Sequence, residues 1–97
     1  MVSNVPKQDL IIKLLTVLFP TSKIYLFGSR ARGTHTERSD IDIAIDIGRK
    51  LEIDEWAIAD GVLAGLNIPQ KIDVIDVWRA SESMKQQILK DGIVWKA

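Results

Sequence analysis

The chain has 97 residues, the size of one domain, and we expect residues 1–97 to form a single domain. A hydrophobic fraction of 46% and a charged fraction of 27% are typical of a globular protein and exclude a disordered or collagen-like chain. Basic and acidic residues both number 13, so the net charge is zero, which argues against nucleic-acid binding through a general positive field. The absence of cysteine and the single histidine exclude disulfides and multi-histidine zinc sites, and they fit the reducing cytoplasm.

The first predicted element is an amphipathic helix over residues 10–19. Leu10, Leu14 and Leu18 recur at every fourth position and form one apolar stripe, which Ile11 and Leu15 widen. The stretch is much shorter than the ~20 apolar residues that span a bilayer, so we expect no membrane segment.

The same helix has recognisable ends in the sequence. Asn4 is a candidate cap, and Pro6 suits the first helical turn, where a missing backbone N–H costs nothing. Pro20 cannot continue a helix and is expected to end it.

The rest of the chain alternates between strand and helix patterns. Period-two alternation predicts strands, most clearly where isoleucine occupies every second position from Ile41 to Ile47. Acidic first turns and glycine stops predict helices. The expected elements are strands over 23–27, 41–47 and 71–78, a helix over 51–66 with apolar residues at 53, 56, 57, 63 and 66, a helix from Ser81 to Gly92, and a short strand over 93–95. This order indicates an α/β or α+β domain with helices packed on a small sheet.

Connection lengths predict how the strands pair. The connection between the first two strands is too short for a parallel crossover, which needs about a dozen residues, so these strands should be antiparallel neighbours. The helix over 51–66 is a full crossover, so the third strand should lie parallel to the second, in a mixed sheet. The end of the first strand and the starts of the other two therefore meet at one end of the sheet.

Three aspartates are expected at this end: Asp40, Asp42 and Asp73. Asp40 and Asp42 point to the same face about 6.6 Å apart, at ~3.3 Å of rise per residue. Carboxylates gathered in this way repel one another unless a cation neutralises them, and oxygen-only ligands favour Mg²⁺ or Mn²⁺. The alternative is that Asp40 and Asp42 are only the solvated face of a half-buried strand.

A candidate phosphate-binding turn precedes the aspartates. Gly28 lets a phosphate approach the backbone, Ser29 offers a hydroxyl, and the start of a short helical turn over 30–33 favours anions. Arg30 and Arg32 are candidates for charge-assisted phosphate contacts, but side chains two apart on a helix diverge, so only one is expected to serve, and we assign Arg30. A solvated helix face is the alternative for both.

Other polar residues are expected to lie outside this site. Asp76 competes with Asp73, but it lies on the opposite face of its strand and away from the start. Asp46 shares the face of Asp42 at the other end of its strand, where it should face solvent, and His35 is expected in an exposed loop. The tryptophans at 56, 78 and 95 are expected in the core or at an interface.

Gly28-Ser29, ten intervening residues, Asp40-Ile41-Asp42 and the later Asp73 within a strand resemble the DNA polymerase beta-like nucleotidyltransferases. In so short a chain the pattern is most similar to the minimal nucleotidyltransferases. The resemblance covers nearly the whole chain and implies an α-β-α-β-α-β core. It also implies that Gly28 and Ser29 hold the phosphates of a nucleoside triphosphate. The aspartates would then ligate two magnesium ions, with Asp73 helping to deprotonate the attacking hydroxyl.

The resemblance extends to a possible biological setting. Many minimal nucleotidyltransferases resemble antitoxins whose partner is a HEPN-domain RNase, and some transfer AMP from ATP to a tyrosine of that toxin. The expected function is therefore Mg²⁺-dependent transfer of AMP to a hydroxyl of a HEPN-domain toxin, within a homo- or hetero-oligomer in the cytoplasm. The apolar residues of the last helix and the segment 93–95 are candidates for the contact surface.

Two alternatives to this function stay open. The chain could be a non-catalytic antitoxin that neutralises its partner by contact, or it could transfer the nucleotide to RNA or a small molecule. Thr34 stands where the phosphate-binding lysine belongs, which argues against a P-loop, and nothing in the sequence could grip duplex DNA.

Overall fold

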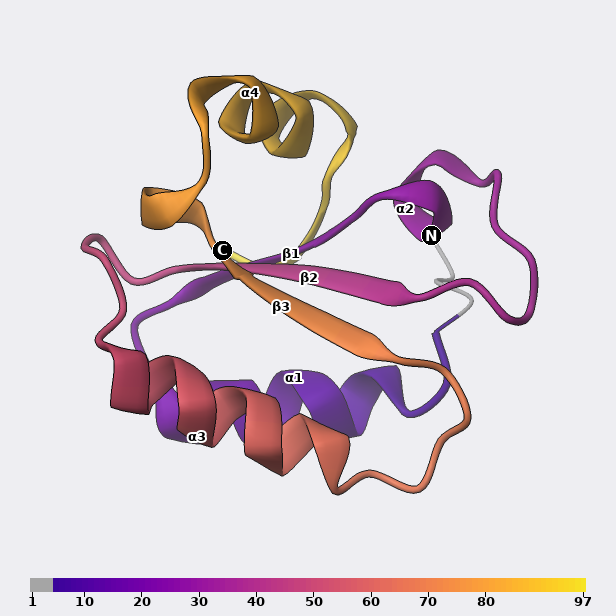
Figure 1. The fold of residues 1–97 in the computed structure, drawn as a ribbon, viewed down its shortest axis with the longest axis horizontal. Coiled ribbons are helices and arrows are strands. Elements are labelled where there is room, and N and C mark those ends of the chain that lie inside the picture. Colours follow the sequence, from indigo (N-terminus) through magenta and orange to yellow (C-terminus); the bar gives the residue numbers. More distant parts are fainter. Residues whose placement is uncertain (1–4) are drawn as a thin grey trace.

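The computed structural model describes residues 5–97, which form a four-stranded sheet with helices on both faces (Figure 1). The elements in chain order are α1 (Gln8–Leu18), β1 (Lys23–Phe27), α2 (Ser29–Arg32), β2 (Ile41–Asp46), α3 (Ile53–Ala64), β3 (Ile72–Asp76), a 3₁₀ turn η1 (Val77–Arg79), α4 (Glu82–Asp91) and β4 (Ile93–Lys96). Helices α1 and α3 cover one face of the sheet, and α4 covers the other (Figure 1). The predicted fold class is confirmed.

The strand order is β3-β2-β1-β4. β1 is antiparallel to β2 and β2 is parallel to β3, as the connection lengths predict. β4 pairs antiparallel with β1 at the opposite edge from β3, a position that the sequence did not predict. The end of β1 and the starts of β2 and β3 therefore lie at the same end of the sheet.

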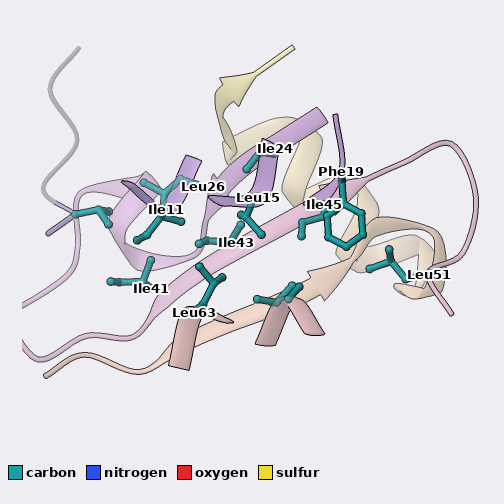
Figure 2. Close-up of a cluster of buried hydrophobic side chains, with 13 residues drawn as sticks. Ile11, Leu15, Phe19, Ile24, Leu26, Ile41, Ile43, Ile45, Leu51 and Leu63 are labelled. Carbon is teal, nitrogen blue, oxygen red and sulfur yellow. The ribbon is translucent and has the colours of Figure 1, made fainter. Parts of the chain in front are cut away.

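The main core lies between the sheet and the pair α1 and α3 (Figure 2). The alternating isoleucines of β2 are fully buried there: Ile41, Ile43 and Ile45. A smaller cluster on the other face joins Ile88 of α4 to Phe27 and Ala44. Helix α4 covers the middle of this second face. Polar residues, Asp42 and Asp46, therefore occupy the two ends of β2 on this face, and both are half-buried.

The start of α1 differs from the prediction. The helix begins at Gln8, so Pro6 lies in the preceding turn and not in the first helical turn. Lys7 occupies the N-cap position in a left-handed conformation, with φ of 56°, and no side chain caps the helix. Asn4, the candidate cap, lies outside the described residues.

No helix within residues 5–97 has the length and apolar character needed to cross a membrane.

The buried side of α1 is also rotated relative to the predicted stripe. Ile11 and Leu15 are fully buried, whereas Leu10 is 40% exposed. The helix carries apolar residues over more than half of its circumference, so periodicity alone did not identify which of them would meet the sheet.

Helix α3 is shorter than the predicted helix over 51–66. Glu52 is its N-cap and forms a capping box with Glu55, whose carboxylate accepts a hydrogen bond from the Glu52 N–H at 2.8 Å. Its buried residues are Ala59 and Leu63, whereas Ile53 is 80% exposed. The predicted apolar face is therefore wrong at the start of the helix.

β3 ends earlier than predicted because of Asp76. This carboxylate is 5% exposed and accepts hydrogen bonds from the N–H groups of Leu51, at 2.7 Å, and Trp78, at 2.9 Å. The bond to Trp78 turns the chain into η1, and Arg79 Nε lies 3.6 Å from the same carboxylate. Asp76 therefore ties β3 to the segment before α3, which is a structural role on the opposite face from Asp73.

One of the three tryptophans lies against the core, and the other two are partly exposed. Trp95 packs against the main core, but Trp56 and Trp78 are 41% and 44% exposed. The indole N–H of Trp78 donates to Asp46 Oδ1 at 2.7 Å. Asp46 is therefore held by a neighbour and does not simply face solvent.

We expect Asp76→Ala to lower the free energy of unfolding by about 2–4 kcal/mol, because two backbone N–H groups lose a buried charged acceptor. Urea denaturation of both proteins measures the difference. Asp73→Ala is the matched control on the same strand and should change stability by less than about 1 kcal/mol, since its ion pair is exposed. Equal effects of the two substitutions would contradict the structural role of Asp76.

Candidate active site

The register of the sheet brings two aspartates side by side. Asp42 on β2 is the Cα partner of Asp73 on β3, and it is also the Cα partner of Phe27 on β1. Residues paired in this way project from the same face of a sheet. Phe27 is the last residue of β1, so the Gly28-Ser29 turn follows directly beside Asp42.

The negative charges of Asp40 and Asp73 act on Asp42. Burial, and then the negative charges of Asp73 and Asp40, raise the pKa of Asp42 above the usual aspartate value. The positive charges of Arg32 and Lys71 oppose this increase. Asp40 and Asp73 therefore both lie close enough to Asp42 for their charges to act on its carboxylate.

Lys71 is a neighbour of the site that sequence reasoning missed. Its Nζ lies 3.4 Å from Asp73 Oδ1, with both side chains substantially exposed. The available signal was the spacing, because a residue two positions before Asp73 at the start of a strand points to the same face.

The donor set of the site is chemically suited to a hard divalent cation, since it consists of carboxylate oxygens without nitrogen or sulfur ligands. Within residues 5–97, however, no three acidic or histidine side chains are arranged closely enough to hold a metal ion. Binding a cation would require the carboxylates to rotate toward one another.

Gly28 allows the turn to approach Asp42. Its backbone has φ of 74° and ψ of −156°, a region that only glycine occupies readily. A Cβ atom at this position would overlap the carboxylate of Asp42. Ser29 begins α2, the predicted helical turn, where Gly28 O accepts hydrogen bonds from Ala31 N and Arg32 N at 3.2 and 3.1 Å.

In the structure, the Arg30 side chain contacts a loop of the protein, which differs from the phosphate contact that was expected for it. Its side chain is buried, with 7% exposure, and it donates hydrogen bonds to backbone carbonyl groups of the loop before β2. The acceptors are Thr36 O, Glu37 O and Ser39 O. Of the two arginines, Arg32 is the one whose charge acts on Asp42. The expectation for His35 is wrong in part, because this residue is half-buried.

A separate apolar hollow of 330 Å³ lies at the far end of β3 from Asp73. Its lining includes Trp56, Ile75 and Arg79. Its lining contains Asp76 but none of Asp40, Asp42, Asp73 and the Gly28-Ser29 turn, so we do not assign it to the same site.

We expect Asp42→Asn to raise the melting temperature at pH 7, because it removes a charge that the folded state disfavours. The pKa of Asp42 is higher in the folded protein than its usual value of 3.8. The wild-type protein therefore loses stability through this residue as pH rises above 3.8. The increase in melting temperature of Asp42→Asn over the wild type should therefore disappear below pH 3.8. It should reach its full size above the raised pKa of Asp42. Thermal unfolding followed by circular dichroism across this range measures it.

Asp60→Asn is the control, since Asp60 lies on α3 and forms no hydrogen bond or ion pair in the described structure. A stability loss for Asp42→Asn at pH 7 would show that the carboxylates do not repel one another as described.

We expect Gly28→Ala to cost about 1–3 kcal/mol of unfolding free energy, because alanine is strained at this backbone conformation. Gly33→Ala is the control: Gly33 also has positive φ, but a Cβ there meets no atom within 4 Å. Adding Asp42→Ala should relieve part of the cost for Gly28→Ala and none for Gly33→Ala. Chemical denaturation of the single and double variants measures this coupling, and additive effects would contradict the close contact.

Comparison with known proteins identifies the family of this chain. Residues 10–96 match the family described as polymerase beta, nucleotidyltransferase. The protein adenylyltransferase MntA of Shewanella oneidensis is 37% identical over 87 residues, which are 88% of this chain. The chain spans only 61% of the length of that relative.

Solved structures show the same similarity. A chain in a toxin–antitoxin crystal structure with AMP-PNP has a TM-score of 0.80 and 33% identity, over 95% of this chain and 75% of that chain. A chain in the complex of a tri-AMPylated Shewanella oneidensis HEPN toxin with an MNT antitoxin has a TM-score of 0.73 and 30% identity, over 94% and 71%. Since the family match extends over nearly the whole sequence, this chain belongs to the polymerase beta nucleotidyltransferase family.

Proposed function

We propose that this chain is an Mg²⁺-dependent adenylyltransferase that moves AMP from ATP to a hydroxyl group of a HEPN-domain toxin, for which it is the antitoxin. The observation that carries the proposal is the pairing of Asp42 with Asp73 beside the Gly28-Ser29 turn. The similarity to a protein adenylyltransferase, and to chains in complexes with AMP-PNP or with an AMPylated HEPN toxin, supports the choice of nucleotide and partner. The absence of cysteine supports a cytoplasmic setting.

The turn after β1 would hold the triphosphate. Gly28 has no side chain to obstruct a phosphate, and Ser29 and the first amides of α2 supply hydrogen-bond donors. Arg32 lies on the same short helix and already acts electrostatically on Asp42, so it is placed to attract the negatively charged nucleotide.

Asp40, Asp42 and Asp73 would hold two Mg²⁺ ions, with Mn²⁺ as a substitute. When bound, these ions would neutralise charge on the attacking and leaving oxygens. The oxygen-only donor set fits them, and the repulsion that raises the pKa of Asp42 would be relieved by a cation. Lys71 would have to release the carboxylate of Asp73.

In the proposed reaction, the acceptor hydroxyl oxygen attacks the α-phosphorus of ATP. The bond between that phosphorus and the oxygen leading to the β-phosphate breaks, and pyrophosphate leaves. Asp73 would help to take the hydroxyl proton. The protein's contribution is then to orient the triphosphate with the turn and to place negative charge next to the acceptor oxygen.

We expect this chain, with α-labelled ATP and Mg²⁺, to label the product of its neighbouring gene, which the proposal identifies as a HEPN-domain toxin. Asp42→Asn and Asp73→Asn should each reduce the labelling rate at least about 100-fold, and EDTA should abolish it. Asp46→Asn is the matched control, because it lies on the same face of β2 and its remaining oxygen can still accept from Trp78.

The outcomes separate the possible functions. Neutralisation of the toxin by Asp42→Asn, without label under any condition, would favour a contact antitoxin. Label on RNA or on a small molecule in place of the protein would identify a different acceptor and contradict the proposed partner.

A further inference from the structure

We infer that Arg30 is a positioning residue that holds the loop over residues 34–39 and thereby fixes Asp40 in the site. The catalytic part of this inference rests on the proposed function. Arg30 follows Ser29 directly, and the loop that its side chain contacts leads directly into Asp40. One side chain therefore connects the phosphate-binding turn to the first aspartate.

The contacts of Arg30 converge on a single turn of the backbone. Nε donates to Ser39 O at 3.2 Å, and Nη2 donates to the same oxygen at 3.1 Å. Nη2 also lies 3.1 Å from Glu37 O and 3.4 Å from Thr36 O. The guanidinium thus gathers three carbonyl groups that precede Asp40.

The loop also has hydrogen bonds that do not involve the Arg30 side chain: Thr34 N donates to Ser29 O at 3.0 Å, and Thr36 N donates to Ser39 Oγ at 2.9 Å. Residues 34–39 are all polar, and four of the six are exposed. Thr36 and Ser39 form a tight turn, in which Ser39 N donates to Thr36 O at 3.1 Å, and Gln70 Nε2 adds an exposed tether to Glu37 O at 2.8 Å. No residue of the loop contributes to the hydrophobic core clusters of residues 5–97.

Because Arg30 is buried, its charged guanidinium favours the loop conformation that supplies hydrogen-bond acceptors to it. A buried charge is tolerated when its donors are satisfied, and the Nε and Nη2 donors of Arg30 are satisfied by carbonyl groups of this loop. The planar guanidinium can reach several acceptors at once, which a lysine ammonium on its flexible chain does less well. Arg30→Lys therefore keeps the charge and weakens the positioning.

Hydrogen–deuterium exchange tests the loop directly and needs no activity. We expect the peptide covering residues 34–40 to exchange about 10-fold faster in Arg30→Lys and faster still in Arg30→Met, with unchanged exchange in β1 and β2. Arg38→Gln is the control, since Arg38 is exposed in the same loop and forms no hydrogen bond or ion pair in the described structure. Unchanged loop exchange in Arg30→Lys would overturn the inference.

A second pair of measurements separates positioning from simple structural support. In Arg30→Lys, with its fold checked by circular dichroism, we expect Mn²⁺ affinity measured by electron paramagnetic resonance to fall about 10-fold. The kcat for AMP transfer should fall by a similar factor, while the KM for ATP changes less than about 2-fold. A loosened loop with unchanged Mn²⁺ affinity and kcat would overturn the positioning role.

The failure of the proposed function would be visible separately. If the wild-type chain transfers no AMP to any acceptor, that function is wrong, but loop exchange and Mn²⁺ affinity in Arg30→Lys still decide whether Arg30 places Asp40.

Discussion

The repulsion between carboxylates at the start of β2 and β3 is the constraint around which this end of the molecule is arranged. Sheet register fixes Asp42 beside Asp73, and burial adds to the cost of keeping Asp42 ionised. Two cations, Arg32 and Lys71, offset part of that cost from opposite flanks. Gly28 completes the arrangement by leaving space where a side chain would overlap the carboxylate. A protein selected only for stability would have no reason to gather these charges.

The rest of the fold supports this unfavourable cluster. The larger core beneath the sheet locks the alternating isoleucines of β2, so the strand cannot shift by one residue without exposing them. On the other face, α4 packs over Ala44 and Phe27 and covers only the middle of the strands. The polar residues at the two ends of β2 consequently have different roles. Asp42 belongs to the candidate site, whereas Asp46 accepts a hydrogen bond from the indole N–H of Trp78.

Family membership and the local geometry give different kinds of information about this part of the chain. Family membership alone would not distinguish the roles of the two arginines in the short helix α2. Their placement does so, because Arg30 is buried against loop carbonyl groups while Arg32 is exposed and acts on Asp42. The same reasoning separates the two aspartates of β3: Asp73 lies with the site, and Asp76 closes the turn after the strand.

The sequence by itself determined the order of elements, the pairing of the first three strands and the end of the sheet where Asp40, Asp42 and Asp73 gather. Period-two patterns, connection lengths and residue spacing are local properties, and they were sufficient for these conclusions. Tertiary structure alone decided which side of α1 is buried, where β4 pairs and which carbonyl groups Arg30 reaches. Those outcomes depend on contacts between segments far apart in the chain, and a long side chain such as arginine can reach several partners that local spacing does not distinguish.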